Sequence, residues 1–354
     1  MGTYLVKLYY KDKPIIGLDI SQTGVKIMSV DSKKMLVSGY GSMDLDPIKM
    51  EDSIDKKDDY FQNSLSELMT KNLLGSLPSN HVIISVPTSR TFTRTFNLPA
   101  DAEHHLKQAI ELEIDQYIPL PAETLYIDYE IVDRSKESIT ICLSAAPRTL
   151  IDRYIEVVES TGLRVISVEP GINSVARLLE RTEEGHLPTV IVDIGPASTD
   201  IAILDGSIRV TGSTTIGGNT FTLDIAKKLN VPLDNAHQLK ILNGLNSGPR
   251  QQKLKSALTP SLQRILSETR KVIRYYNERL ENKRKLEQVL IVGGGSNLPG
   301  IGEFFTDELV MPARVASPWQ RLNFGKLQEP PKQFKARYIT VAGLALLHSE
   351  EILK

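Results

Sequence analysis

The sequence predicts an α/β protein with two similar lobes, and three observations lead to this prediction. A strand–turn–strand–turn–strand pattern occurs twice, beginning near residues 15 and 190. Each copy carries an aspartate inside its first apolar strand, Asp19 and Asp193. A third apolar run, residues 289–292, ends in three glycines. A chain of 354 residues is also long enough for two or more domains.

The composition is that of an ordinary globular protein, with 41% hydrophobic and 24% charged residues. The net charge of −1 gives no general attraction to nucleic acid or anionic membrane. Cys142 is the only cysteine, which excludes an intramolecular disulfide and fits a reducing compartment. The N-terminus is too polar for a signal peptide, and no apolar run reaches the roughly 18–20 residues of a spanning helix. We expect a cytoplasmic protein that reaches the membrane only through a partner.

The first repeat, IIGLDISQTGVKIMSVD at residues 15–31, consists of two β-like runs around a polar turn. Asp19 lies between Leu18 and Ile20. A carboxylate in so apolar a strand costs several kcal/mol unless another group compensates it. For one copy alone, an ordinary β-hairpin is the alternative.

The second repeat, VIVDIGPASTDIAILD at residues 190–205, has the same design around Asp193. Asp19 and Asp31 are separated by the same interval as Asp193 and Asp205. Two copies indicate two lobes that each offer one hairpin to a shared cleft. The N–H groups of small-residue turns bind phosphate, and two facing carboxylates can hold a hydrated Mg²⁺. The repeats therefore predict a nucleotide–metal cleft.

The glycine-rich segment QVLIVGGGSNLPGIGEFFTDEL, residues 288–309, predicts a strand followed by a helix that begins near Pro299. Glycines at the end of the strand allow a ligand to approach the backbone closely. The spacing does not match GxGxxG, so a plain strand–helix connection is the alternative.

The order of these motifs resembles the actin superfamily, which includes actin, DnaK-type chaperones, sugar kinases and FtsA. The first hairpin, with Asp19 and Lys26, is similar to the first phosphate motif of that family. VIVDIGPASTD is similar to its second phosphate motif, and LIVGGGSNLPGI to its adenosine motif. Residues 166–180 and 338–347 lie where the two connecting helices belong. The resemblance implies an actin-like (ribonuclease H-like) two-lobed ATPase fold.

Residues 81–165 predict a β/α subdomain inserted into the first lobe. Asp101 is expected to N-cap a helix that turns Leu106, Ile110 and Ile114 to one face. The stretch NLPADAEHHLKQAIELEIDQYIPLPAETLYIDYEIV resembles the PilM family of type IV pilus assembly proteins.

The resemblance also implies the domain boundaries. The first lobe comprises residues 1–80, 166–186 and 338–354, and the insertion comprises residues 81–165. The second lobe comprises residues 187–337, with a helical subdomain at about 219–287. Within it, residues 262–280 predict a helix, and residues 242–260 a loop.

The resemblance implies ATP with Mg²⁺ in the cleft, with the metal held by Asp19 and Asp193. Lys26 would approach the β- and γ-phosphates. The residues expected to contact the nucleotide are Ser21, Thr23, Gly24, Lys26, Gly195, Ser198, Thr199, Gly217, Gly218, Asn219, Lys271, Gly293, Gly294, Gly295 and Ser296.

Several of these positions have a plain alternative. Lys271 can form an i,i+3 ion pair with Glu268 on a solvated helix face. The segment from Gly217 can be an ordinary helix start, N-capped by Asn219 or Thr220.

The sequence departs from the family pattern in both turns. Ser21 replaces the usual glycine of the first turn, and Pro196 and Ala197 replace two glycines of the second. Proline has no N–H to offer a phosphate. We therefore expect ATP binding with weak or absent hydrolysis. Glu169 is the candidate for orienting a catalytic water, and a structural contact at the start of a helix beside Pro170 is its alternative.

The family resemblance implies a component of a type IV pilus or related secretion platform at the inner face of the cytoplasmic membrane. Its expected partner is the N-terminal cytoplasmic peptide of a PilN-like inner-membrane protein. Self-association is a further expectation, and nucleic-acid binding is not expected. Two alternatives stay open. An FtsA-like division protein would carry a C-terminal membrane helix, which the sequence lacks. A sugar or metabolite kinase would need a catalytic aspartate that the sequence does not reveal.

Overall fold

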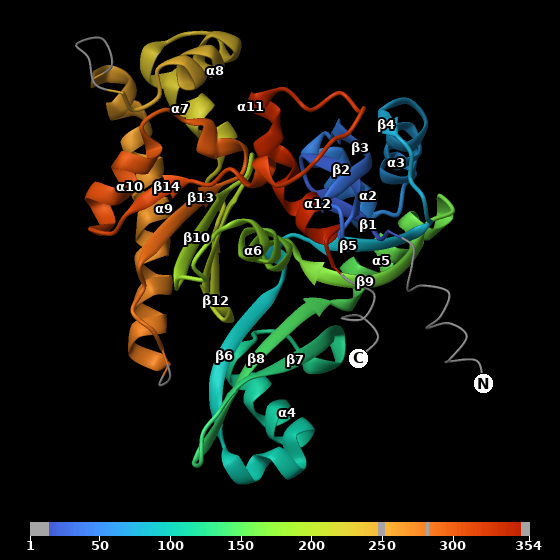
Figure 1. Cartoon of the computed structure of the whole chain (residues 1–354), viewed down its shortest axis with the longest axis vertical. Helices are drawn as coiled ribbons and strands as arrows, with labels where there is room; N and C mark the ends of the chain where they lie inside the picture. The colour runs from blue at the N-terminus through green and yellow to red at the C-terminus, as the bar shows by residue number, and fades with distance from the viewer. Residues whose placement is uncertain (1–13, 247–251, 281–282, 348–354) are drawn as a thin grey trace. The chain divides into compact units, whose positions relative to one another are not determined.

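The computed structural model describes residues 14–246, 252–280 and 283–347 (Figure 1). The chain forms two compact units, each assembled from segments that are distant in sequence. The first unit comprises Met1–Pro87, Thr149–Glu183 and Ser317–Lys354, and the second comprises Thr88–Arg148 and Glu184–Ala316.

The first unit is built around a six-stranded sheet with the order β4-β3-β2-β1-β5-β9. The first three strands form an antiparallel meander, whereas β5 runs parallel to β1 and β9 parallel to β5. The strands are β1 (Ile16–Ser21), β2 (Gly24–Asp31), β3 (Leu36–Asp44), β4 (Leu73–Gly75), β5 (His81–Val86) and β9 (Arg164–Pro170). The helices are α2 (Pro47–Asp55), α3 (Tyr60–Lys71), α5 (Arg148–Ser160), α6 (Gly171–Thr182), α11 (Lys332–Lys335) and α12 (Ile339–Leu344).

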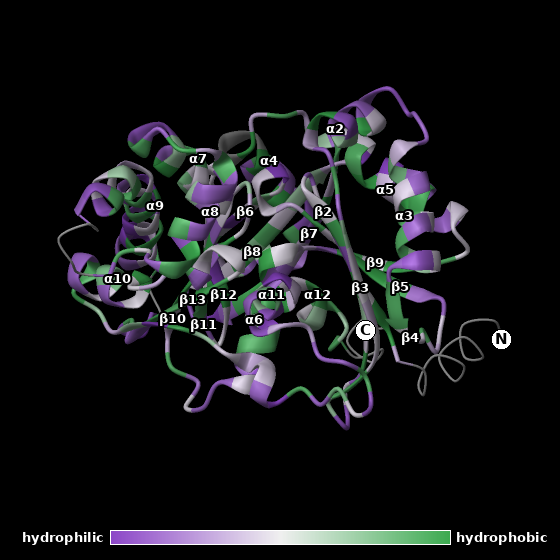
Figure 2. Ribbon diagram, turned by 90° about the horizontal axis from the view of Figure 1, so that it is seen from above, coloured by the Kyte–Doolittle hydropathy of each residue, from purple (hydrophilic) through white to green (hydrophobic). Residues whose placement is uncertain are grey.

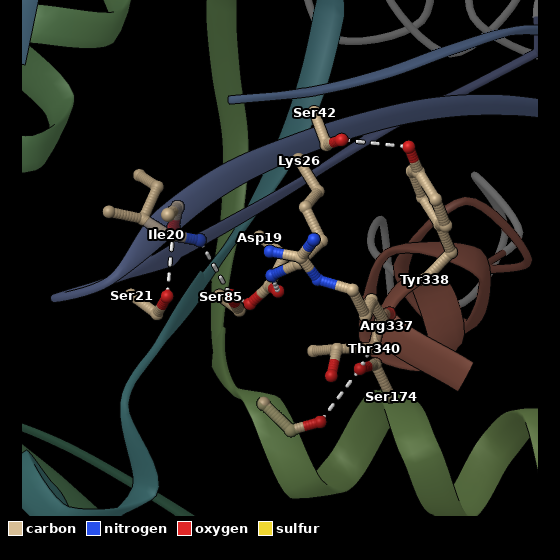
Figure 3. Close-up of polar contacts among 12 residues, drawn as sticks. Asp19, Ile20, Ser21, Lys26, Ser42, Ser85, Ser174, Arg337, Tyr338 and Thr340 are labelled. Atoms are coloured by element: carbon tan, nitrogen blue, oxygen red, sulfur yellow. Dashed lines mark hydrogen bonds and ion pairs between the residues drawn. The ribbon is translucent and has the colours of Figure 1, made fainter. Parts of the chain in front are cut away.

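Helices α6 and α12 cross closely in this unit. A Cβ added at Gly343 would overlap the carbonyl oxygen of Ser174, so the crossing requires glycine. The Ser174 hydroxyl donates to the carbonyl of Thr340 at 3.0 Å (Figure 3). Both predicted connecting segments are thus helical in part. Residues 166–170 belong to strand β9 instead, because they pair with β5.

The second unit contains a five-stranded sheet with the order β12-β11-β10-β13-β14. Its strands are β10 (Thr189–Ile194), β11 (Thr199–Asp205), β12 (Ser207–Thr214), β13 (Gln288–Val292) and β14 (Ala313–Val315). Its helices are α7 (Gly218–Leu229), α8 (Leu233–Leu242), α9 (Gln252–Arg279) and α10 (Ile301–Leu309). The two predicted meanders, β1–β3 and β10–β12, are confirmed, and so is the strand before the glycines.

Helix α9 corrects the loop predicted over residues 242–260. Residues 252–260 are helical, with Pro260 inside the helix, while residues 247–251 lie outside the described part of the chain. Leu254, Ala257 and Leu258 are buried at helical spacing, and this burial offsets the cost of the proline. Hydrophobic and hydrophilic residues alternate around α9 in Figure 2.

A three-stranded sheet with the order β6-β8-β7 falls within the segment predicted as an inserted subdomain. Its elements are β6 (Phe92–Pro99), α4 (Leu106–Tyr117), β7 (Leu125–Arg134) and β8 (Ser138–Pro147). Ile110 and Ile114 pack into its core as predicted. The prediction that Asp101 N-caps the helix is wrong, because a 3₁₀-helix over Ala100–His105 precedes α4 and begins after Pro99.

This subdomain packs within the second unit. The Tyr275 hydroxyl on α9 donates to the carbonyl of Thr95 on β6 at 2.9 Å. The domain boundaries expected from the resemblance stay a prediction, since compactness does not define evolutionary lobes.

Candidate functional site

In the first unit, the strand register aligns polar residues into one row across the sheet. Asp19 on β1 is the partner of Lys26 on β2 and of Ser85 on β5. Ser85 is in turn the partner of Glu169 on β9. Register partners share one face of a sheet, so three residues predicted separately belong to one polar row.

The Asp19 carboxylate has two partners in this row. Lys26 Nζ lies 2.9 Å from Asp19 Oδ2, and the Ser85 hydroxyl donates to Oδ1 at 2.8 Å (Figure 3). The side chains of Asp19 and Lys26 are only 13% and 11% exposed. The lysine therefore compensates the charge that made Asp19 unusual in the sequence, and Ser85 is a site residue that sequence reasoning missed.

The first turn is closed by the serine that replaces glycine. The Ser21 hydroxyl donates to the carbonyl of Gly24 at 2.8 Å. The carbonyl of Thr23 accepts from the backbone N–H of Leu45 at 3.0 Å. Ser21 thus has a structural contact that glycine cannot make.

Glu169 is held by an arginine of helix α6. Arg177 donates to both carboxylate oxygens, at 2.8 and 2.6 Å, and also to the carbonyl of Gly343 at 3.1 Å. The bidentate geometry fixes the carboxylate and links it to the crossing of α6 and α12. The role of Glu169 toward a catalytic water stays a prediction.

In the second unit, the glycine-rich turn packs against Asp193. A Cβ at Gly293 would overlap Asp193 Oδ1, and this glycine has φ = +79°. Ser296 closes the turn by donating its hydroxyl to the carbonyl of Gly293 at 2.7 Å. Gly294 and Gly295 begin a short 3₁₀-helix that follows β13. The structure therefore brings Asp193 and the segment Gly293–Ser296 together.

The second turn and the start of α7 are locked to each other. The N–H of Gly195 donates to the carbonyl of Ser198 at 2.9 Å, which leaves Pro196 and Ala197 as a two-residue loop. The N–H groups of Gly218 and Asn219 donate to the carbonyls of Gly195 and Pro196, each at 2.9 Å. The first amides of α7 are therefore engaged by the turn.

This packing explains the cap of α7. The N-cap is Gly217, so the alternative of a cap by Asn219 or Thr220 is wrong. A Cβ at Gly217 would lie 2.6 Å from the carbonyl oxygens of Gly195 and Pro196, so a larger residue does not fit. The Thr199 hydroxyl donates to the carbonyl of Ile216 at 2.7 Å and ties the second strand to the same place.

Lys240 on α8 is a second residue that sequence reasoning missed. Its Nζ donates to the carbonyl of Gly218 at 2.9 Å and to the Thr222 hydroxyl at 2.8 Å. Burial lowers the pKa of Lys240 to about 8. An ammonium has three donors, and within the described residues these two bonds use two of them. One of its three donors therefore has no hydrogen-bond partner within the described residues.

Lys271 lies elsewhere on the second unit. Its side chain is 67% exposed on α9, and Nζ pairs with Glu268 Oε2 at 3.0 Å. This is the i,i+3 ion pair considered as the alternative, and the nucleotide contact stays a prediction.

A pocket opens beside the glycine-rich turn. It has a volume of about 450 Å³ and is lined by the turn, by the start of α10 and by β14. Glu303, Asp307 and Arg314 contribute its charged groups. The volume lies within the range of small-molecule sites.

Within the described residues, no group of three or more histidine, cysteine or acidic side chains is arranged to hold a metal ion. In the same part of the chain, no helix combines the length and apolar character needed to cross a membrane.

Comparison with known proteins gives consistent matches. The family model described as type IV pilus assembly protein PilM matches residues 17–349. A solved PilM–PilN type IV pilus biogenesis complex superimposes with a TM-score of 0.77 at 20% identity, covering 96% of this chain and 99% of that one. MreB5 of Spiroplasma citri bound to ADP gives 0.52 at 14% identity, with 97% and 98% covered. These structures show an actin-like fold.

Among curated proteins, the cell division protein FtsA of Borreliella burgdorferi is 28% identical over 190 residues. The match covers 48% of this chain and spans 45% of the length of that relative.

Proposed function

Since the chain belongs to the family of type IV pilus assembly proteins PilM, we propose that it binds ATP–Mg²⁺ and the N-terminal cytoplasmic peptide of a PilN-like inner-membrane protein. The observation that carries the nucleotide proposal is the buried Asp19–Lys26 pair beside the first turn. A paired aspartate and lysine offer a hydrated metal and a phosphate their respective counter-charges.

The proposed nucleotide contacts follow from the chemistry of each group. Asp19 and Asp193 would hold the hydrated Mg²⁺, and Lys26 would share its ammonium between Asp19 and a phosphate. Lys240 adds a buried cation whose third N–H would donate to a phosphate. The nucleoside would lie against Gly293–Ser296 and the adjacent pocket. Nucleotide contacts at the other residues expected from the resemblance, Lys271 included, stay predictions.

We further propose that hydrolysis is weak or absent. In the second turn the N–H of Gly195 is engaged, Pro196 has none, and the first amides of α7 donate to the turn itself. Few backbone donors remain to stabilise charge on a transferring phosphate. Phosphate release over many turnovers, at a rate well above that of Asp19→Asn, would contradict this part.

Solved structures of similar fold support the proposal. One solved structure is a complex of PilM with PilN, and MreB5 was solved with ADP and with AMPPNP. A partner anchored in the inner membrane would recruit this chain to the cytoplasmic face of that membrane. Self-association stays a prediction.

The decisive test is a pull-down with an immobilised PilN-type N-terminal peptide, with and without ATP–Mg²⁺. Retention on the peptide and not on a scrambled sequence of equal charge is the expected result. Isothermal titration with ATP–Mg²⁺ tests the nucleotide separately. Failure of the PilN-type peptide to retain the protein refutes the partner proposal. The lack of any heat of binding with ATP–Mg²⁺ refutes the nucleotide proposal.

A further inference from the structure

The end of strand β3 brings a carboxylate to the first turn. Asp44 is the register partner of Gly24, and a Cβ at Gly24 would lie 3.8 Å from Asp44 Oδ1. The proposed function assigns a phosphate group to this turn. A phosphate held at this turn would be repelled by a carboxylate so close to the turn, so the charge of Asp44 would oppose a bound nucleotide.

Arg337 holds this carboxylate. Its guanidinium forms an ion pair with Asp44 Oδ1. The residue belongs to the 3₁₀ turn Ala336–Tyr338, which leads into α12. Figure 3 shows its side chain extending from this turn toward the strands that carry Asp19 and Lys26.

Tyr338, the residue after Arg337, contacts strand β3 beside the polar row. The Tyr338 hydroxyl donates to Ser42 Oγ at 2.8 Å, and Ser42 is the register partner of Lys26. The Tyr338 ring also packs edge-on against Tyr40, with 5.5 Å between the ring centroids. The residue that follows Arg337 is therefore anchored to β3 at the register partner of Lys26.

The ion pair itself is easily exchanged. Asp44 is 74% exposed and Arg337 is 34% exposed, and exposed pairs contribute little to stability. A phosphate offers the guanidinium a bidentate partner with more charge than a carboxylate. A phosphate within reach of Arg337 would thus be a stronger partner for its guanidinium than Asp44 is.

We propose that Arg337 is an additional phosphate-binding residue, and that Asp44 is its internal competitor in the nucleotide-free protein. This inference rests on the proposed binding of ATP–Mg²⁺. On binding, Arg337 exchanges the carboxylate of Asp44 for a phosphate of the nucleotide, and Asp44 turns out to solvent.

The test is the affinity for ATP–Mg²⁺, measured by isothermal titration on variants of the full chain. Arg337→Ala should weaken binding roughly tenfold or more, since it removes a charge-assisted hydrogen bond. Asp44→Asn should tighten binding, by roughly threefold, since it removes the competitor. The gain from Asp44→Asn should shrink in the Arg337→Ala background. Arg337→Lys, which keeps the charge without the bidentate fork, should be intermediate.

A matched control is the exposed pair Arg134–Glu103 in the inserted subdomain, where the charged groups are 3.3 Å apart. Arg134→Ala and Glu103→Gln should leave the affinity unchanged. If the Arg337–Asp44 pair were purely structural, loss of either partner would change the affinity for ATP–Mg²⁺ in the same direction. Opposite changes in Arg337→Ala and Asp44→Asn therefore distinguish the proposed exchange from a structural role.

Two outcomes overturn the inference while the proposed function stands. They are an unchanged affinity in Arg337→Ala, and an affinity in Asp44→Asn that equals or falls below that of the unmodified protein. If the unmodified protein does not bind ATP–Mg²⁺, the proposed function is refuted and this inference falls with it.

Discussion

Replacing Asp19 by asparagine tests the charge pair at the centre of the first unit. Asparagine keeps the volume and can still accept the hydroxyl of Ser85, but it leaves Lys26 Nζ without the anion that lies 2.9 Å away. Breaking a fully buried pair costs about 3–5 kcal/mol, and breaking an exposed one about 0–1 kcal/mol. Both side chains are mostly buried and one contact survives, so Asp19→Asn should lower the free energy of unfolding by about 2–3 kcal/mol.

The same variant should lose its response to nucleotide. A ligand at a hundred times its dissociation constant stabilises the folded state by about 2.7 kcal/mol. In the unmodified protein, ATP–Mg²⁺ should produce this shift in urea unfolding followed by circular dichroism. In Asp19→Asn the shift should vanish, because the hydrated Mg²⁺ loses its carboxylate and Lys26 loses the group that orients it.

Asp31 in the same hairpin supplies the matched control. Its carboxylate accepts from the N–H groups of Lys33 and Lys34 at 3.1 Å in an exposed turn. Asp31→Asn should cost less than about 1 kcal/mol and keep the full response to ATP–Mg²⁺. The reasoning is refuted if Asp19→Asn unfolds like the unmodified protein, or if ATP–Mg²⁺ stabilises it by the same amount.

Three further predictions concern the second unit and use urea unfolding. Gly293→Ala should destabilise by more than about 2 kcal/mol, because its Cβ overlaps Asp193, whereas Gly162→Ala, at φ = +87° with open space around it, should cost only about 1 kcal/mol. Burial raises the pKa of Asp205, but hydrogen bonds from Tyr276 and Arg284 outweigh it and lower the pKa overall. The ionised Asp205 therefore contributes its full stabilisation above pH 3.8, the pKa of the unfolded chain, and this contribution is lost as the pH falls through the lower pKa of the folded protein. Asp205→Asn should abolish this loss of stability in acid. The folded protein should release the proton of Lys240 at about pH 8, before the unfolded chain does at 10.5, so stability should rise between these values; Lys240→Met should remove that rise.

The sequence was sufficient to predict a structural feature where a residue type is unusual for its local surroundings. Asp19 and Asp193 are carboxylates within apolar strands, and their repetition at one interval marked both hairpins. The three glycines after residue 292 were equally visible, because they end an apolar run and allow a close approach to the backbone. Local patterning therefore found both meanders and the glycine-rich turn.

What the sequence could not reveal depends on contacts between distant segments. Ser85 and Glu169 join the row of Asp19 only through the parallel pairing of β1, β5 and β9. Lys240 resembles any solvent-facing lysine of a helix, and its burial arises from the packing of α8 on the start of α7. The loop predicted over residues 242–260 is wrong from residue 252 onward, because buried apolar residues around Pro260 keep α9 continuous.

The two departures from the family pattern have different structural consequences. Ser21 replaces a glycine and closes its turn with its own hydroxyl, which adds a contact within the first turn. Pro196 removes an amide, and its carbonyl accepts from Asn219 at the start of α7, so the second turn also withdraws a helix donor from any ligand. The sequence predicts the missing N–H of Pro196. It does not predict that the N–H of Asn219 is engaged by the turn. If ATP binds as proposed, its phosphates are held more by Lys26, Lys240 and the hydrated metal than by turn amides. Lysine and metal charge act on bound and transferring phosphate alike, which favours tight binding over rate acceleration.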